Sequence, residues 1–281
     1  MKSLVMKTLM TVLCMLAWGT AAAAPAPAGP APQALPTWTE PLTGAEFVAL
    51  PKACFQMGSA KLIEPPWDSF WARLRYKGHL AENEQPQHEV CVDQFWMAKK
   101  EVTEGDWHKV MGGEAPKGSG SRVKVNVTWD EANEFARRLS AKSGGKFRLR
   151  LPTEAEWEYA CRAGDTSEGV LELPEIERQA WTGEVPNSRY EPRDVGLLAP
   201  NAFGLYDMLG NAWEWTQDSY LADAYTRHSL YNPIVQAEGK PRVMRGGSHR
   251  TEQYQVRCTM RSRYEPGYTM DTIGMRLVRE P

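Results

Sequence analysis

The chain has 281 residues and a formal net charge of −2, since 33 Lys and Arg stand against 35 Asp and Glu. Hydrophobic residues make up 42% and charged residues 24%, values of a globular protein that exclude disorder of the whole chain. The balanced charge argues against nucleic acid or an anionic membrane as a partner, and 23 Gly, 20 Pro and 11 Trp favour a loop-rich fold over a helical bundle.

The first 24 residues have the pattern of a secretory signal peptide. Two early lysines precede an apolar run over 9–18, which is too short to span a bilayer, and Ala21–Ala23 offer a small-residue cleavage site. A retained anchor is the alternative. A lipoprotein signal at Cys14 is disfavoured, because the residues before it are not the small ones that a lipobox needs.

The short signal is typical of bacteria, so we expect a periplasmic protein. No later segment has the apolar length of a membrane-spanning helix, and no membrane partner is expected after signal cleavage. Residues 25–37 are rich in Ala and Pro and predict an extended linker. A single domain is expected over residues 38–281.

The domain is predicted to begin with two strands. Residues 54–58 have the pattern of a strand that ends at a glycine turn, and residues 88–97 alternate apolar and polar side chains as a strand does. The polar and aromatic stretch over 60–84, with two adjacent prolines, predicts a long loop or insertion.

Three helices are predicted from their capping residues. The caps and their partners are Thr103 with Asp106, Thr128 with Glu131, and Thr153 with Glu156. The second helix has apolar residues at helical spacing and ends at Gly144–Gly145, and the third ends at Gly164. A short strand over 147–151 separates these two helices. No long helix is expected after residue 164, so the predicted fold class is α+β.

Four cysteines follow the predicted signal peptide: Cys54, Cys91, Cys161 and Cys258. An even number in an oxidising compartment predicts two disulfides, and three pairings are open from the sequence. Four buried free thiols are the alternative. No CxxC pattern is present, which argues against a structural zinc site.

Six segments in order carry a family resemblance. They are FQMGS at 55–59, EVT at 101–103, RLPTEAEWEYACRAG at 150–164, NAFGLYDMLGNAWEWTQD at 201–218, RGGS at 245–248 and GMRLVR at 274–279. Together they resemble the formylglycine-generating enzyme, or sulfatase-modifying factor, family over residues 50–280. The resemblance implies a modified C-type-lectin-like α+β fold with few helices, short strands and much ordered loop.

The resemblance also implies a structural Ca²⁺ site and a pattern of disulfides. Asp207 and Glu214 offer the hard oxygens that calcium prefers. By position, the family's ligands are the carbonyls of Asp207, Gly210 and Ala212 and the side chain of Glu214; the alternative is that Glu214 merely pairs with an arginine. The family's bridge joins Cys161 to Cys258, which leaves Cys54 with Cys91.

The chain departs from the family after Gly-Gly-Ser. Formylglycine generators place two copper(I)-binding, oxygen-activating cysteines there, and soft thiolates suit that metal. Here residues 249–257 contain no cysteine, and Thr251 stands at the first position. Since Cys258 is assigned to the structural bridge, we predict that this protein does not form formylglycine in sulfatases.

The inherited pocket offers other candidate residues. His249, Glu252 and Tyr254 form a polar set with Thr251 that could act as a base or bind a redox metal of unknown identity. A surface loop with incidental polar residues is the alternative. The candidate substrate-binding residues are Trp213, Arg245, Ser248, Arg257 and Arg261, because Arg and Trp favour acidic or π-rich ligands.

An exported branch of the family without the cysteine pair is the nearest match in architecture. That branch is implied to act at the oxidation of the dihydropyoverdine chromophore during siderophore maturation. We therefore expect an oxidative maturation factor whose partner is a siderophore precursor or a peptide-like small molecule. The alternative is a non-catalytic, lectin-like module that binds a peptide or serves a periplasmic metalloenzyme.

Overall fold

The structure is a computed structural model, and it describes residues 34–60, 82–166, 173–183 and 190–281. The account below concerns the unit formed by Leu35–Pro281. The predicted signal peptide and all but the end of the predicted linker lie outside the described residues. Most of the predicted 60–84 loop lies outside them as well.

A five-stranded antiparallel sheet brings the two ends of the domain together. Its strands, in spatial order, are β1 (Thr37–Thr39), β2 (Glu46–Leu50), β5 (Phe95–Ala98), β13 (Val278–Arg279) and β6 (Leu149–Arg150). The C-terminal strand β13 lies between β5 and β6. The sheet is therefore complete only when the last residues of the chain pair with both of these strands.

A second sheet has four strands and carries the motif that contains Trp213 and Glu214. Its order is β11 (Arg261–Tyr264), β10 (Arg242–Arg245), β9 (Trp213–Ser219) and β12 (Ile273–Gly274), and β12 pairs parallel to β9. Two small sheets complete the set, β3 (Ala53–Met57) with β4 (His88–Val92), and β7 (Ala180–Trp181) with β8 (Leu209–Gly210).

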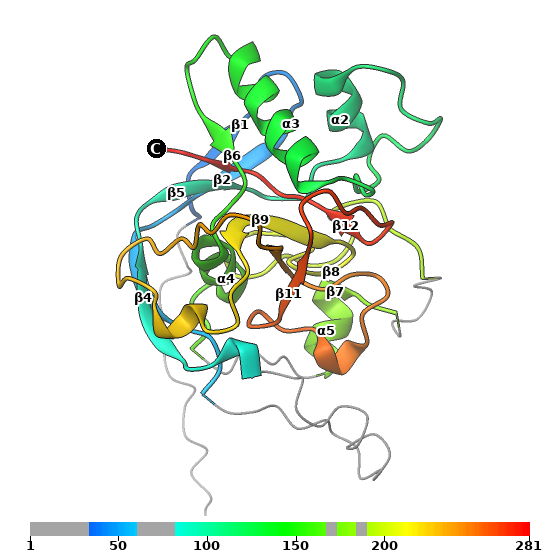
Figure 1. Cartoon of the computed structure of the whole chain (residues 1–281). Helices are drawn as coiled ribbons and strands as arrows, with labels where there is room; N and C mark the ends of the chain where they lie inside the picture. The colour runs from blue at the N-terminus through cyan, green and yellow to red at the C-terminus, as the bar shows by residue number, and fades with distance from the viewer. Residues whose placement is uncertain (1–33, 61–81, 167–172, 184–189) are drawn as a thin grey trace, which may run out of the picture. The chain divides into compact units, whose positions relative to one another are not determined.

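The described part of the chain has four α-helices; three begin where their caps predict, and the fourth was not predicted from the sequence. They are α2 (Glu104–Met111), α3 (Trp129–Lys142), α4 (Glu154–Arg162) and α5 (Leu173–Gln179). Thr103, Thr128 and Thr153 each cap a helix in a full capping box, in which threonine and acid satisfy each other's backbone N–H groups. In Figure 1, α2 and α3 lie together beside β1, β2 and β6, while α4 lies near β9 and β4.

The predicted fold class α+β, with few helices and short strands, is confirmed. The prediction of one strand over residues 88–97 is wrong, because β4 and β5 belong to different sheets. The chain changes sheet at Asp93, whose backbone N–H and side chain both bond to Asn232 and whose carboxylate pairs with Lys52. The predicted 147–151 strand is shorter, Leu149–Arg150.

Helix α4 is the most enclosed helix of the described residues, since all nine of its residues are buried. It packs in a core cluster around Trp157 together with the β3–β4 sheet. A second cluster lies under α3, which buries Ala132, Phe135, Ala136 and Leu139 against Trp215 and neighbouring residues. Such burial is the main stabilising term of the fold.

Two disulfides tie the core to its surroundings, in the pairing that the family resemblance implied. Cys54–Cys91 joins directly opposed residues of β3 and β4, and Cys161–Cys258 joins α4 to the loop before β11. Within the described ranges, no helix has the length and apolar character needed to cross a bilayer.

Candidate functional site

The Gly-Gly-Ser segment forms a tight, buried turn. Gly246 and Gly247 follow β10 with φ values of 97° and 80°, and a side chain at Gly246 would meet the Trp157 ring and the Met208 carbonyl at 3.1 Å. The backbone N–H of Ser248 then donates to Thr251 Oγ1 at 2.8 Å, and the Thr251 N–H donates to the Ser248 carbonyl at 2.9 Å. The Thr251 side chain and backbone therefore hold the turn.

His249 is 1% exposed and is bonded on both sides of its ring. Its Nδ1 lies 2.9 Å from the Asn211 carbonyl, which can only accept, so Nδ1 carries the proton. Nε2 accepts from Arg250 Nε at 3.4 Å, and Arg250 also pairs with Asp271. Burial lowers the pKa of His249 below its ordinary value, so the ring is neutral at pH 7.

The other two members of the predicted catalytic set lie on the next turn of chain. Glu252 is half-buried and precedes the 3₁₀ helix η3 (Gln253–Gln255), which contains Tyr254. The side chain of Tyr254 lies outside the described part of the structure. The structure therefore places His249 and Thr251 in the same turn. It does not test whether His249, Glu252 and Tyr254 form one catalytic set.

The three arginines predicted to bind substrate are buried in ion pairs. Arg245 Nη2 donates to Glu158 at 2.6 Å and Nη1 to Glu154 at 3.1 Å, while Arg261 Nε donates to Glu154 at 2.6 Å. Arg257 pairs with Glu84 in the same way. Burial opposes ionisation of Glu154, but Arg261 and Arg245 outweigh it and leave the pKa of Glu154 below its ordinary value.

These contacts correct the prediction for the arginines. Their guanidinium groups form ion pairs with carboxylates inside the protein, because an unpaired buried charge would destabilise the fold. Of the other two predicted contacts, Ser248 is buried in its turn, and Trp213 is half-buried against the second core cluster.

The predicted calcium ligands surround a buried group of carboxylates. Glu214 accepts from Arg276 Nη2 at 2.8 Å and from Trp157 Nε1 at 2.7 Å, so the pairing with an arginine left open from the sequence is present. Asp207 Oδ2 accepts from the Gly196 N–H at 2.6 Å, whereas its buried Oδ1 has no partner among the described residues.

Glu101, which the sequence did not single out as a site residue, completes this group. It accepts from Asn211 Nδ2 at 2.6 Å and from the Ala212 N–H at 3.2 Å. Burial and the charges of Asp207 and Glu214 raise its pKa well above the ordinary value, and burial raises the pKa of Asp207 to about 6. The available signal was the EVT motif, which places an acid two residues before a helix cap.

The arrangement suits a calcium ion in part. No three His, Cys, Asp or Glu side chains of the described residues converge on one metal position. Calcium also accepts carbonyl ligands, and the set here pairs two carboxylates with the Gly210 and Ala212 backbone. The unpartnered Asp207 oxygen is the donor that fits, and the raised pKa values of Glu101 and Asp207 show that Arg276 alone does not offset the three carboxylates. Glu214 would have to share its oxygens with Arg276.

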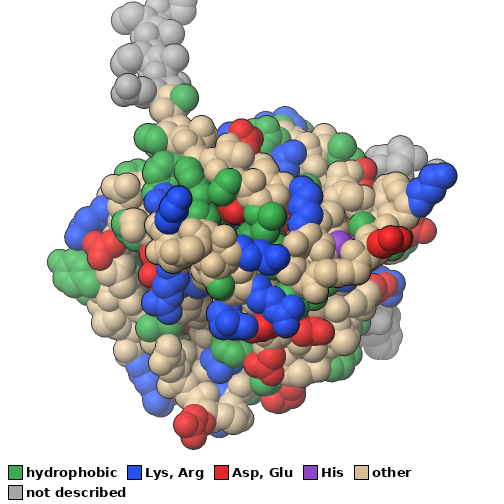
Figure 2. Space-filling view, turned by 90° about the horizontal axis from the view of Figure 1, so that it is seen from above, with side chains coloured by type: hydrophobic (Ala, Val, Ile, Leu, Met, Phe, Trp, Pro, Cys, Tyr) green, Lys and Arg blue, Asp and Glu red, His purple; other side chains and the backbone are tan. Residues whose placement is uncertain are grey.

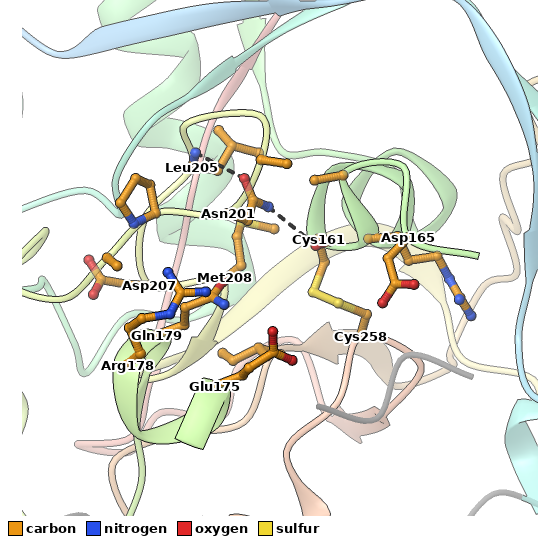
Figure 3. Close-up of a pocket in the computed structure, with 16 residues that line it drawn as sticks. Cys161, Asp165, Glu175, Arg178, Gln179, Asn201, Leu205, Asp207, Met208 and Cys258 are labelled. Carbon is orange, nitrogen blue, oxygen red and sulfur yellow. Dashed lines mark hydrogen bonds between the residues drawn. A yellow bond between two sulfur atoms is a disulfide. The ribbon is translucent and has the colours of Figure 1, made fainter. Parts of the chain in front are cut away.

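A cavity of about 520 Å³ opens beside this group and was not predicted (Figure 3). Glu175, Arg178 and Gln179 from α5 line one side, and the Cys161–Cys258 disulfide lines the other. Asn201 fixes the wall by donating to the Ala160 carbonyl at 2.8 Å and accepting from the Leu205 N–H at 3.1 Å. Such a volume suits a small organic molecule.

Comparison with known proteins gives the family context of these sites. A family model described as "Sulfatase-modifying factor enzyme 1-like domain" matches residues 33–281. The formylglycine-generating enzyme of Bos taurus is 31% identical over 233 residues, which cover 74% of this chain and 58% of that protein. The enzyme of Mus musculus is 34% identical over 167 residues, covering 54% and 42%. The chain thus spans about half the length of these curated relatives.

Two solved structures resemble the whole domain. PvdO from Pseudomonas aeruginosa matches with a TM-score of 0.73 and 26% identity, covering 89% of this chain and 100% of that chain. Treponema denticola variable protein 1 matches with a TM-score of 0.66 and 24% identity, covering 88% and 99%. The second likeness shows the shared fold alone.

Proposed function

The chain belongs to the family of sulfatase-modifying factor enzyme 1-like domains, and on that premise we propose that it is an exported maturation factor of the PvdO kind. Its activity would be the oxidation of the dihydropyoverdine chromophore in siderophore biosynthesis. The observation that carries the proposal is the match to PvdO, which extends over 100% of that chain and 89% of this one.

The state of the cysteines favours this function over formylglycine formation. All four cysteines of the described residues are joined in disulfides, and the Thr251 hydroxyl is bonded to the Ser248 N–H. Since copper(I) in formylglycine generators needs two thiolates, the described site lacks the ligands for that chemistry. The two disulfides also support the proposed export to an oxidising periplasm.

The proposed oxidation removes two electrons and two protons from the dihydro precursor. An acceptor outside the chain, such as dioxygen, takes the electrons. We place the precursor in the 520 Å³ cavity, where the exposed Arg178 guanidinium can pair with an acidic group and Glu175 can accept a hydroxyl proton. The walls formed by Leu205 and Met208 would cover its aromatic face.

A deletion strain tests the function directly. Without the gene, the secreted siderophore should lack the absorbance and fluorescence of the mature chromophore, and the wild-type gene should restore both. Arg178→Gln should restore about a tenth or less, because it loses a charge-assisted pair to the substrate. Arg227→Gln, at an exposed arginine paired with Asp223, is the control that should restore fully. A normal chromophore in the deletion strain would reject the proposal.

A binding module without catalysis is the second candidate, and His249 favours it. Both ring nitrogens of this buried histidine are engaged within the protein, so no free base faces a ligand there. Purified protein incubated with purified dihydro precursor in air separates the two candidates. A catalyst accelerates chromophore formation in proportion to its concentration, whereas an accessory module leaves the rate unchanged.

The calcium site remains part of the proposal. Asp207 and Glu214, with the Gly210 and Ala212 carbonyls, would hold the ion, and its charge would offset the buried carboxylates, Glu101 included. The role of the calcium ion would be structural, because it would connect the loop before β8 to strand β9.

A further inference from the structure

A groove of about 810 Å³ lies between α3, β6 and the β9–β10 pair, on residues that the proposed function does not use. Four arginines line it, namely Arg137, Arg148, Arg150 and Arg242. Glu238 is the one acidic residue in this lining. Lys and Arg side chains also gather near the centre of the view from above, the side on which Figure 1 draws α2 and α3 (Figure 2).

Three of the four arginines already have carboxylate partners. These pairs are Arg137 with Glu134 at 2.7 Å, Arg150 with Glu156 at 2.7 Å, and Arg148 with Glu280 at 3.6 Å. Arg242 forms no ion pair with any carboxylate that the structure describes. Its Nη1 donates to the Gln217 carbonyl and to Ser219 Oγ, both at 3.1 Å, while its buried Nε has no partner in the same described set.

Arg242 is also held in place before any ligand arrives. Its guanidinium carbon lies 3.9 Å from the centre of the Trp129 ring, a close cation–π contact. The ring is fixed in turn, because Trp129 Nε1 donates to the Thr216 carbonyl at 2.7 Å. A guanidinium held by a ring on one face and by two acceptors at Nη1 loses little freedom on binding, so an anion at its unpartnered Nε keeps most of the interaction energy.

We propose that this groove binds a ligand carrying two or more carboxylate groups, with one carboxylate on the unpaired Nε edge of Arg242. A second carboxylate of the ligand would pair with Arg148 at the edge of the groove. The Arg148 side chain is 74% exposed, and its Nη1 lies 3.6 Å from Glu280 Oε1. A small polycarboxylate and an acidic stretch of peptide share this chemistry, and the volume accommodates either.

Titration calorimetry on the full chain tests the proposal with two probes, citrate and an acetylated tri-glutamate amide. Tri-glutamine amide is the neutral control. At least one acidic probe should bind, and Arg242→Gln should weaken it about ten-fold or more. Arg242→Lys should weaken it nearly as much, because lysine keeps the charge but loses the planar fork. Arg138→Gln, which removes a Glu134-paired arginine outside the lining, should change affinity by less than about two-fold.

The probe that binds identifies the source, since citrate alone indicates a small molecule and the peptide alone indicates an acidic segment. In wild-type protein labelled with ¹⁵N-tryptophan, the Trp129 indole signal should also shift with the binding probe, a readout independent of how the variants fold. The proposal is overturned if neither acidic probe binds, if tri-glutamine binds equally, if Arg138→Gln costs as much as Arg242→Gln, or if the Trp129 signal does not move.

Discussion

Asp218 is a buried acid whose ionisation the fold resists. It accepts from the Glu154 N–H at 2.7 Å and from the Val235 N–H at 2.8 Å, yet burial, together with the nearby charge of Glu154, raises its pKa to about 7. An acid with a raised pKa in the folded state binds more protons there than in the unfolded chain. Its contribution to the free energy of unfolding therefore falls as pH rises from about 4 to about 7.

Asp218→Asn should remove this pH dependence. The difference between wild type and variant should change by about 4 kcal/mol, as an upper estimate, between pH 4 and pH 8, with the wild type losing stability relative to the variant. Urea unfolding at a series of pH values measures it. A constant difference across the series would mean that Asp218 titrates as an ordinary surface acid.

Glu158 shows what a buried ion pair costs when it is broken. Its Oε2 accepts from Arg245 at 2.6 Å, and its Oε1 accepts from Arg162 at 2.9 Å and from the Gly58 N–H at 2.8 Å. Glu158→Gln leaves two buried guanidinium groups short of negative charge, so the free energy of unfolding should fall by about 3–5 kcal/mol.

The matched comparison for Glu158 is an exposed pair. Lys52 and Asp93 lie 2.7 Å apart with side chains 64% and 59% exposed. Lys52→Gln should leave the denaturation midpoint almost unchanged, because solvent screens such pairs. Equal losses for Glu158→Gln and Lys52→Gln would show that the buried cluster does not stabilise the fold as the structure implies.

At the scale of elements, the α4 cap offers a graded test. Thr153 Oγ1 accepts from the Glu156 N–H at 3.1 Å, and Glu156 Oε2 accepts from the Thr153 N–H at 2.8 Å. Thr153→Ala should cost about 1–2 kcal/mol. Thr128→Ala, at the equivalent cap of α3, should cost less, because the α3 cap bonds are exposed and water can replace them. Thermal unfolding of both variants ranks them, and a larger loss for Thr128→Ala would contradict this reasoning.

Caps predicted three helices because this signal is local in sequence. Thr103, Thr128 and Thr153 mark their helices within three residues of the partner acid. The change of sheet at Asp93 could not be predicted in this way, since Asn232 lies 139 residues further along the chain. Strand pairing depends on such distant partners, which periodicity does not record.

In the candidate site, too, residue types were predicted from the sequence, whereas contacts between distant residues were not. The sequence placed His249 and Thr251 in a polar set of the inherited pocket and Asp207 among the calcium ligands, and the structure buries all three. It assigned Arg245 and Arg261 to a substrate, because a single sequence gives no sign that Glu154 and Glu158, about 90–110 residues earlier in the chain, neutralise them. Residue type predicted the charge, and only the fold decided what the charge faces.

At the scale of the whole molecule, the calcium proposal joins parts of the chain that are far apart. Arg276 from the C-terminal segment, Glu214 on β9 and Glu101 before α2 meet at one buried group, with Asp207 beside them. A cation here would stabilise the folded state alone, because the unfolded chain does not assemble the ligands. Calcium at about 100 times its dissociation constant should add about 2.7 kcal/mol, or roughly 5–10 °C in the melting temperature.

Differential scanning calorimetry in calcium and in a chelator measures this shift. Asp207→Asn keeps an acceptor for the Gly196 N–H but loses the charge on the unpartnered oxygen, so it should abolish the calcium-dependent part of the shift. Asp223→Asn, at an acid exposed on the surface and paired with Arg227, should retain it. Magnesium should substitute poorly, since carbonyl-rich sites of irregular geometry favour calcium. If wild type melts at the same temperature in calcium and in chelator, Arg276 and protons on the buried acids neutralise the group, and the calcium proposal is rejected.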